Sequence, residues 1–263
     1  GAHGPFGVTH VDPAARRRDV GGAAVVSADV ETQLKQRLGA TKVTRLAGSN
    51  RYATAQTVAG EVKRLVNLGG GTVDTVFLAT GGDFPDALAA SSLAAAMKAP
   101  VLLTKTTSLP SQTHQALVDL KPSRVIVCGG TVVVSAQVES AIRGNASYGS
   151  PTVVRLAGSN RYGTARELVE WGRSSSGGGL EPEWGVDGLY LATGEDYPDA
   201  LAGGALAGGD GTWRPLMLTR PTYLRNEAKA VIGGLGNASF VTLVGGTSAL
   251  SEQVRIDALD LIR

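Results

Sequence analysis

The sequence predicts an α/β fold built from two tandem modules, each a four-stranded, mainly parallel sheet flanked by helices, with part of a third module ahead of them. Three observations support this prediction. Long runs of residues occur twice in the same order. Short apolar runs alternate with longer segments that have the apolar spacing of helices. Glycine is abundant, at 36 of 263 residues, as expected where strands turn tightly into helices.

The duplication is carried by four motifs. The run Arg-Leu-Ala-Gly-Ser-Asn-Arg-Tyr at 45–52 recurs letter for letter at 155–162, and the run at 78–89, with Ala-Thr-Gly and Pro-Asp-Ala-Leu-Ala in it, returns at 191–202. An apolar run that ends in Thr104 returns with Thr219 at its end, and a Gly-Gly-Thr turn follows later in each copy. Four motifs in one order indicate a duplicated module.

A fainter third trace lies upstream, where 21–31 parallels 129–139. Each of these segments is followed, after a helix-length stretch, by a copy of the Arg-Leu-Ala-Gly run. The predicted organisation is therefore a tag or disordered leader at 1–20, the C-terminal remnant of an upstream module at 21–42, one module at 43–150 and a second at 151–263.

Each element of the first copy has its own signal. The apolar run at 75–80 is typical of a strand buried on both faces. Pro85 suits the first turn of a helix, and Ser135 suits an N-cap. Strands are predicted at 43–46, 75–80, 100–104 and 124–128, and helices from 49 or 50 to about 65, from 85, over 111–120 and from 135 to near 144.

The second copy repeats this order from 153 to 262. Its two insertions, at 174–179 and 208–211, interrupt no periodic segment and are expected on the surface.

The repeated motifs share one position, because each follows a strand and precedes a helix. In a parallel sheet such turns gather at the carboxyl ends of the strands, where α/β folds bind ligands. One crevice is predicted for each copy, the first surrounded by Asn50, Arg51, Asp83, Asp86, Thr104 and the pair Gly129–Gly130, the second by Asn160, Arg161, Asp196, Asp199, Thr219 and the pair Gly245–Gly246.

Composition limits the function. The net charge of +2 is too small a bias for a nucleic-acid partner, which normally needs a clearly basic face. No apolar run approaches the roughly 18 residues of a membrane span. The single cysteine, Cys128, stands in an apolar run and is expected to be a small buried hydrophobe.

Two pairs of arginines carry the main site hypotheses. Arg51 and Arg161 occupy the first turn of a helix, where the helix dipole opposes a cation. The structural interpretation gives them an ion pair with Asp86 or Asp199, and the functional one makes them hold anionic groups. Arg45 and Arg155 either pin the turn or line the crevice. The polymer-binding candidates are Arg45, Asn50, Arg51, Lys105, Arg155, Asn160, Arg161 and Arg220.

The carboxylate and glycine pairs favour structural roles. Asp83, Asp86, Asp196 and Asp199 suit the first turn of a helix, and no His or Cys accompanies them as a metal ligand. The pairs Gly129–Gly130 and Gly245–Gly246 belong to no nucleotide-binding pattern and are interpreted as tight turns. No catalytic residue, metal or cofactor is predicted.

These motifs resemble the cell wall binding repeat 2 family of Gram-positive envelope proteins. The resemblance rests on the Arg-Leu-Ala-Gly-x-Asn-Arg-Tyr run, the Ala-Thr-Gly-x-x-(Phe/Tyr)-Pro-Asp-Ala-Leu run and the Gly-Gly turn before a capping serine, over nearly all of 43–262. It implies a Toprim-like fold, modules that pack three at a time in a pseudo-threefold unit, and anchoring to anionic secondary wall polymers. Glu195 in place of Gly82 is one departure, and the incomplete third module puts the threefold unit in doubt.

By this resemblance the chain is expected to be a secreted, non-catalytic protein of the cell wall or cell surface. Its expected partner is an anionic wall glycopolymer, with other wall-binding modules as further partners in a pseudo-threefold unit or a homo-oligomer. Two alternatives stay open: a small-molecule-binding or hydrolytic α/β enzyme that uses the strand-end crevice, and an envelope assembly protein whose modules bind each other.

Overall fold

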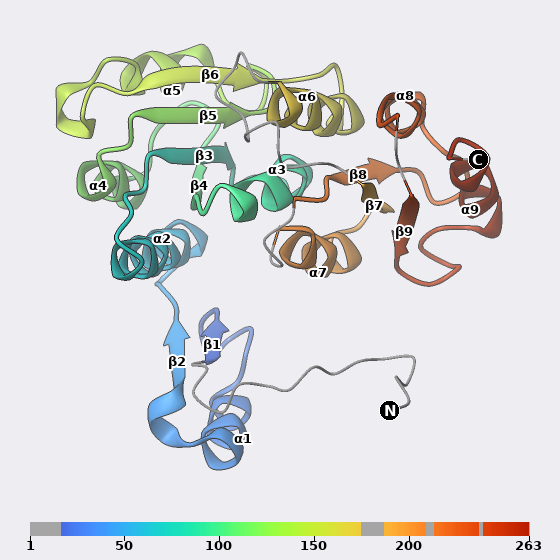
Figure 1. The fold of residues 1–263 in the computed structure, drawn as a ribbon. Coiled ribbons are helices and arrows are strands. Elements are labelled where there is room, and N and C mark those ends of the chain that lie inside the picture. The colour runs from blue at the N-terminus through green and yellow to red at the C-terminus, as the bar shows by residue number, and fades with distance from the viewer. Residues whose placement is uncertain (1–16, 175–186, 209–212, 237–238, 263) are drawn as a thin grey trace.

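The computed structural model describes residues 17–174, 187–208, 213–236 and 239–262, which form three parallel sheets with helices packed against them (Figure 1). The predicted alternation of strands and helices is confirmed in both copies. The elements in chain order are β1 (Arg17–Val20), α1 (Ala28–Leu38), a 3-10 turn (Ala40–Lys42), β2 (Val43–Leu46), α2 (Arg51–Leu68), β3 (Thr75–Thr80), α3 (Pro85–Ala96), β4 (Val101–Thr104), α4 (Ser111–Leu120), β5 (Arg124–Cys128), α5 (Ala136–Ile142), a 3-10 turn (Ala146–Tyr148), β6 (Thr152–Leu156), α6 (Arg161–Arg173), β7 (Gly188–Thr193), α7 (Pro198–Ala207), β8 (Leu216–Thr219), α8 (Asn226–Gly234), β9 (Phe240–Val244) and α9 (Glu252–Leu259).

The sheets do not follow the boundaries of the sequence repeat. The central sheet has the order β4-β3-β5-β6, and β6 is the first strand of the second copy. In the same way β2, the first strand of the first copy, pairs with β1, and the described remainder of the second copy forms a sheet of order β8-β7-β9. The expectation that each copy folds its own four strands into one sheet is therefore wrong. Each copy gives its first strand to the sheet ahead of it.

The chain changes sheets at the turn between that first strand and the next helix. α2 follows β2 but packs against α4 and β4, and α6 follows β6 but packs against α8 and β8. Figure 1 shows this passage clearly between β2 and α2. Both turns contain the repeated Ala-Gly-Ser-Asn sequence, and Asn50 and Asn160 cap the helices that follow.

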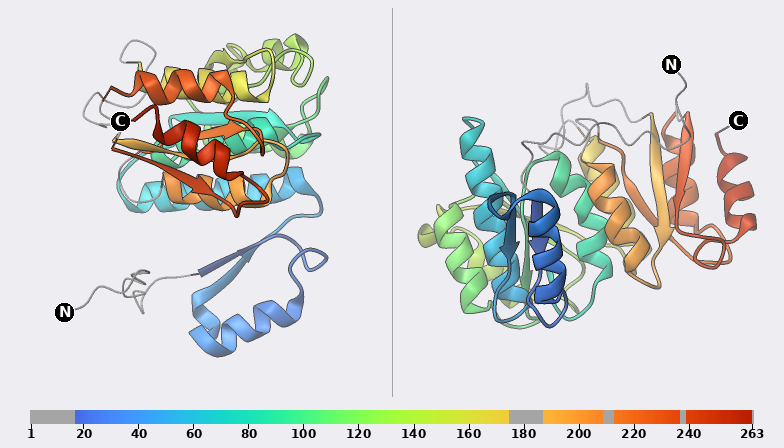
Figure 2. Two further views of the ribbon diagram at one scale, coloured as in Figure 1. Left: turned by 90° about the vertical axis from the view of Figure 1, so that its right-hand side faces the viewer. Right: turned by 90° about the horizontal axis from the view of Figure 1, so that it is seen from below.

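The N-terminal unit of β1, α1 and β2 is set to one side of the other two sheets (Figure 2). Residues 17–20 form strand β1, so this part of the predicted leader is ordered secondary structure, while 1–16 lie outside the described residues. Ser27 caps α1 with the same backbone angles and the same bond from the amide three residues on as Ser135 at α5. This agreement supports the interpretation of 21–42 as part of a third copy.

A side-chain contact of β1 ties this unit to helix α2. Arg18 in β1 donates from Nε to Glu61 in α2 over 2.5 Å, and Arg64 contacts the same carboxylate. The Arg64 guanidinium, with that of Arg18, lowers the pKa of Glu61 to about 2. The carboxylate is therefore ionised in neutral solution and pairs with both cations.

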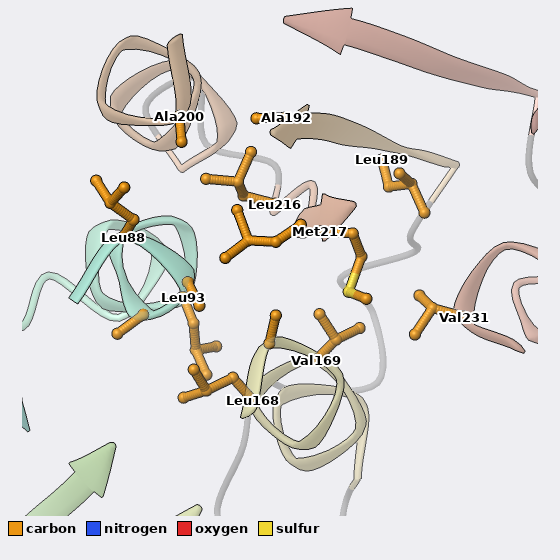
Figure 3. Packing of buried hydrophobic residues seen from close by; sticks show 14 of the residues in the cluster. Leu88, Leu93, Leu168, Val169, Leu189, Ala192, Ala200, Leu216, Met217 and Val231 are labelled. Atoms are coloured by element: carbon orange, nitrogen blue, oxygen red, sulfur yellow. The ribbon is translucent and has the colours of Figure 1, made fainter. Parts of the chain in front are cut away.

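The core passes through the central sheet into the second copy. Along β3, Val76 and Leu78 belong to one buried cluster, whereas Phe77 belongs to the other, as the alternation of a strand requires. The second cluster continues through α3, where Leu93 lies beside Leu168 of α6 (Figure 3). The two copies therefore share one core and do not fold as separate units.

Two further predictions concern the insertions of the second copy and the absence of a membrane span. Apart from Ser174 and Gly208, the insertions predicted to be on the surface lie outside the described residues. Among the helices that the structure describes, none combines the length and apolar character needed to cross a bilayer.

Candidate functional site: a crevice between the two copies

The carboxyl ends of β3, β5 and β6 surround a crevice of about 340 Å³. Its walls come from both copies because β6 belongs to the central sheet. The lining residues are Thr80, Asp83, Pro85, Asp86, Gly130, Val132 and Val133 of the first copy, and Gly158, Ser159, Asn160, Arg161 and Thr164 of the second. The lining predicted for the first crevice is wrong in part, since Asn160 and Arg161 stand beside Asp83 and Asp86 in the place predicted for Asn50 and Arg51.

Asp86, in the first turn of α3, lies at the inner end of the crevice. Its carboxylate hydrogen-bonds the Thr164 hydroxyl, and its burial raises its pKa. It also lies against Gly129, whose φ is +97°. A Cβ added to Gly129 would be 2.2 Å from Oδ2 of Asp86, so this glycine is needed for both its backbone angle and its lack of a side chain.

The same arrangement recurs in the second copy, where Gly245 has φ +119° and lies against Asp199. The positive φ of Gly129 and Gly245 is the backbone angle that the interpretation as tight turns requires, and the structural role of the pairs stays a prediction. Gly130 and Gly246 have no atom within 4 Å of an added Cβ. Cys128, directly before the first pair, is buried as predicted, and its burial raises its pKa.

Arg161 joins the two copies across the crevice. Its guanidinium donates 2.5 Å to the carbonyl of Gly194, pairs at 3.5 Å with Asp83 and lies over the ring of Phe84. Its ion pair is therefore with Asp83, not with the predicted Asp86 or Asp199. Arg51 instead donates to the carbonyl of Gly81, and no carboxylate of the described residues forms an ion pair with it.

Sequence reasoning missed the tyrosines that follow these arginines. An added Cβ on Gly81 would be 2.6 Å from the ring of Tyr52, and one on Gly194 would be 2.7 Å from the ring of Tyr162. Each tyrosine thus packs on the glycine of the Ala-Thr-Gly run in its own copy. The signal was present, because Tyr and Gly are both invariant between the copies.

Arg45 and Arg155 pin the first strand of each copy to the sheet ahead of it. Arg155 in β6 donates from Nε to Glu139 over 2.9 Å and from Nη1 to the carbonyl of Gly129 over 2.7 Å. Arg45 in β2 bonds Glu31 and the carbonyl of Gly21 in the same way. These contacts match the pinning alternative, while a polymer-binding role for either arginine stays a prediction.

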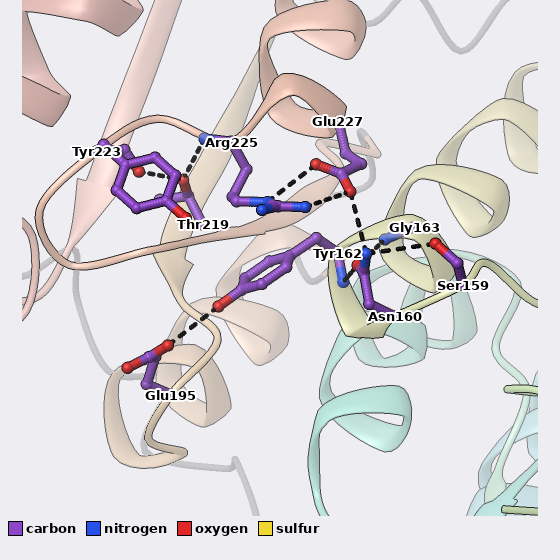
Figure 4. Close-up of polar contacts among 9 residues, drawn as sticks. All are labelled: Ser159, Asn160, Tyr162, Gly163, Glu195, Thr219, Tyr223, Arg225 and Glu227. Carbon is purple, nitrogen blue, oxygen red and sulfur yellow. Dashed lines mark hydrogen bonds and ion pairs between the residues drawn. The ribbon is translucent and has the colours of Figure 1, made fainter. Parts of the chain in front are cut away.

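The second copy adds a network of charges around Tyr162 (Figure 4). Arg225 lies 4.9 Å above the ring and pairs with Glu227, whose carboxylate also accepts from Asn160. Arg220 lies 6.0 Å from the same ring and pairs at 2.5 Å with Glu195. Asn160 and Arg220 are thus already engaged within the chain.

The first copy has different residues at these positions. Gly82 stands in place of Glu195, and exposed Lys105 corresponds to Arg220. Among the described residues no carboxylate forms an ion pair with Lys105. Arg51 and Lys105 therefore keep their positive charge at the rim of the central sheet, where the carboxyl ends of β3 and β4 lie. The corresponding cations Arg161 and Arg220 are neutralised by Asp83 and Glu195.

The remaining acidic candidates do not form a cluster with ligand geometry. Asp196 accepts from the amide of Tyr197, as Asp83 accepts from that of Phe84. Within the described ranges, no group of three or more His, Cys, Asp or Glu side chains is arranged to hold a metal ion.

Curated relatives match most of this chain but are much longer. N-acetylmuramoyl-L-alanine amidase LytC of Bacillus subtilis (strain 168) is 33% identical over 235 residues, which are 89% of this chain and 41% of that protein. The amidase enhancer of the same organism is 29% identical over 241 residues, 92% of this chain and 29% of that protein. The chain thus spans less than half the length of either relative.

Two solved structures share the fold. Cwp8 from Clostridium difficile superposes with a TM-score of 0.75 at 24% identity, over 96% of this chain and 39% of that one. Cwp6 from the same organism gives 0.68 at 24% identity, over 82% and 31%. The Toprim-like label stays a prediction. Residues 45–139 and 155–255 match Cell wall binding domain 2 (CWB2), and the chain belongs to this family of cell-wall proteins.

Proposed function

We propose that this chain is the non-catalytic wall-binding part of a secreted protein and that it holds an anionic secondary polymer of the cell wall. The observation that carries the polymer assignment is the pair of cations at the rim of the central sheet, Arg51 and Lys105, which no described carboxylate neutralises. A polyanion gains from contact with fixed cations of this kind, and salt weakens the attraction. The family match over both copies supports the wall as the target.

The relatives do not make this chain an amidase. The first of them is named as an amidase, but this chain covers 41% of it. The described crevice offers carboxylates, one arginine and hydroxyls, with no histidine or cysteine in its lining. The match to Cell wall binding domain 2 over both copies supports binding as the role of this chain.

Removal of one rim charge tests the polymer assignment. In a sedimentation assay on purified walls, Lys105→Gln should lower the apparent affinity about two- to fivefold, since one exposed charge contributes roughly 0.5–1 kcal/mol. Lys98→Gln removes an exposed lysine that lies just beyond the C-terminal end of α3, away from the carboxyl ends of the strands; it is the control and should bind like the parent. Glu195→Gly should raise the affinity because it frees Arg220 from its ion pair.

Walls stripped of secondary polymers give the deciding comparison. Binding should be lost on stripped peptidoglycan and should fall with added salt. Undiminished retention on stripped walls would contradict the assignment.

A second function, packing against another module of the same kind, is supported by a comparison of α3 with α7. In α3, Leu88 and Leu93 are 6% and 1% exposed because α6 and α7 cover them. The corresponding Leu201 and Leu206 of α7 are 58% and 57% exposed. We propose that a second molecule of this chain covers this face of α7.

The matching surface on the second molecule is α2. Leu168 and Gly172 of α6, which lie near Leu93, correspond to Val58 and Val62 of α2. Val62 and half-exposed Leu65 line an apolar groove of about 520 Å³. The chain therefore carries both halves of an interface that it already uses between its own copies.

Analytical ultracentrifugation tests this packing. The parent chain should sediment faster as its concentration rises, whereas Leu201→Glu with Leu206→Glu should remain monomeric at every concentration because each buried leucine would be replaced by a charge. A parent chain that stays monomeric at high concentration would rule the contact out.

A further inference from the structure

The two carboxylates of the crevice between the copies have more acceptor positions than the contacts they make within the chain. Asp83 accepts from the Phe84 amide and pairs with Arg161, and Asp86 hydrogen-bonds Thr164. Each carboxylate has about four acceptor positions, so these contacts do not use all of them, and both residues line the crevice.

The guanidinium and the side-chain amide of the crevice already have acceptors within the chain. Arg161 is held by the Gly194 carbonyl and by Asp83, and the amide nitrogen of Asn160 bonds Ser159 and Glu227. The charged side chains of the lining are two aspartates against one arginine, a formal charge of −1. An anion entering the crevice would meet two carboxylates and a cation already paired, whereas a cationic donor would meet open acceptors.

The shape adds an apolar side. Pro85 and Val133 line the crevice, and Val132 at its edge is 87% exposed. A volume of about 340 Å³ lies at the small end of the usual range for ligand sites, which is about 300–1,000 Å³. A sugar ring has both a C–H face for such residues and a rim of polar donors for the carboxylates.

The site is complete only at a junction between copies. The corresponding hollow of about 390 Å³ in the second copy is lined by Asp196 and Asp199, but its described lining contains no Gly-Ser-Asn-Arg turn. In the crevice between the copies, the partner of Asp86 is Thr164, which lies in α6 just after the Gly-Ser-Asn-Arg turn of the second copy. Within the described residues, the acids of one copy and the turn of the next meet once.

We propose that this junction crevice is a subsite for an amino sugar, whose protonated amine and hydroxyls donate to Asp86 and Asp83, with one subsite for each pair of consecutive copies. The proposal rests on the wall-binding function and names a sugar unit that the wall polymer would contribute. It also separates two tasks, since the exposed cations Arg51 and Lys105 meet the anionic groups of the polymer while the crevice takes a positively charged unit.

Titration of the purified chain with glucosamine, followed by amide NMR, tests the proposal. Glucosamine should shift the amide signals around Asp86 and Thr164 with a stoichiometry of one. N-acetylglucosamine, which lacks the charge, should bind about tenfold more weakly because a charge-assisted hydrogen bond is lost. Inorganic phosphate should leave these signals unchanged. Saturation by phosphate, equal binding of the two sugars or no response to glucosamine would each overturn the proposal.

Two matched variants place the site. Asp86→Asn keeps the shape of the side chain and should weaken glucosamine binding about tenfold. Asp199→Asn, at the same position of the second copy, should leave it unchanged; equal losses in the two variants would overturn the junction requirement. Retention of the chain on purified walls is measured in parallel. Retention on walls without glucosamine binding would contradict only the subsite. Glucosamine binding without retention on walls would contradict the wall-binding function.

Discussion

Gly129→Ala is expected to destabilise the chain by about 3 kcal/mol, a large effect for a single added methyl group. The backbone of Gly129 has φ +97°, which other residues rarely adopt. The new Cβ would also lie 2.2 Å from the Asp86 carboxylate and 2.7 Å from Val133. Urea denaturation monitored by circular dichroism measures the change as a lower midpoint.

The neighbouring glycine is the control for this prediction. Gly130→Ala adds the same methyl group where no atom lies within 4 Å. Its free energy of unfolding should therefore stay within about 0.5 kcal/mol of that of the parent. The double variant Gly129→Ala with Asp86→Ala should recover part of the loss, since it removes the clash with Asp86 but neither the clash with Val133 nor the backbone strain. Equal midpoints for the two single alanine variants would contradict this account of the turn.

Arg155→Ala is expected to cost about 2 kcal/mol, because partly buried Glu139 loses its partner across the strand junction and keeps only its ion pair with exposed Arg143. It also removes the donor that Arg155 gives to the carbonyl of Gly129. The strand affected is β6, which belongs to the central sheet but to the second copy in sequence. The loss should therefore appear as one cooperative transition of both copies at lower urea, since they share a core.

Arg255→Ala is the matched test of an exposed pair. Arg255 bonds Glu252 one turn away on the surface of α9, and its loss should cost no more than about 0.5 kcal/mol. Arg155→Lys keeps the charge without the planar fork and should fall between the two. An unfolding curve of Arg155→Ala that separates into two steps would contradict the shared core.

The elements were predictable because their signals are local. The apolar run of β3, the proline that starts α3 and the serine caps of α1, α5 and α9 each decide the structure of a few residues. The motif repeats also placed the turns correctly at the carboxyl ends of the strands.

The partners of the strands were not predictable from the same signals. β6 has the same sequence pattern whether it pairs with β5 or with a later strand of its own copy, because periodicity gives the buried faces and not the neighbour. Glu139, which holds Arg155, is also ordinary in sequence as a residue in the first turn of a helix. The composite crevice could not be predicted for this reason, since Asp86 and Thr164 meet only after β6 has crossed into the central sheet.

The crossing of β2 and β6 bears on how tandem chains of this kind can be shortened. A fragment that ends at residue 150, the boundary between the copies in the sequence, would lose the outermost strand of the central sheet and expose the edge of β5. A fragment that ends after Leu156 would keep that sheet whole. A boundary that keeps each sheet whole when such proteins are truncated or fused therefore lies a few residues after residue 150, inside the Ala-Gly-Ser-Asn turn between β6 and α6.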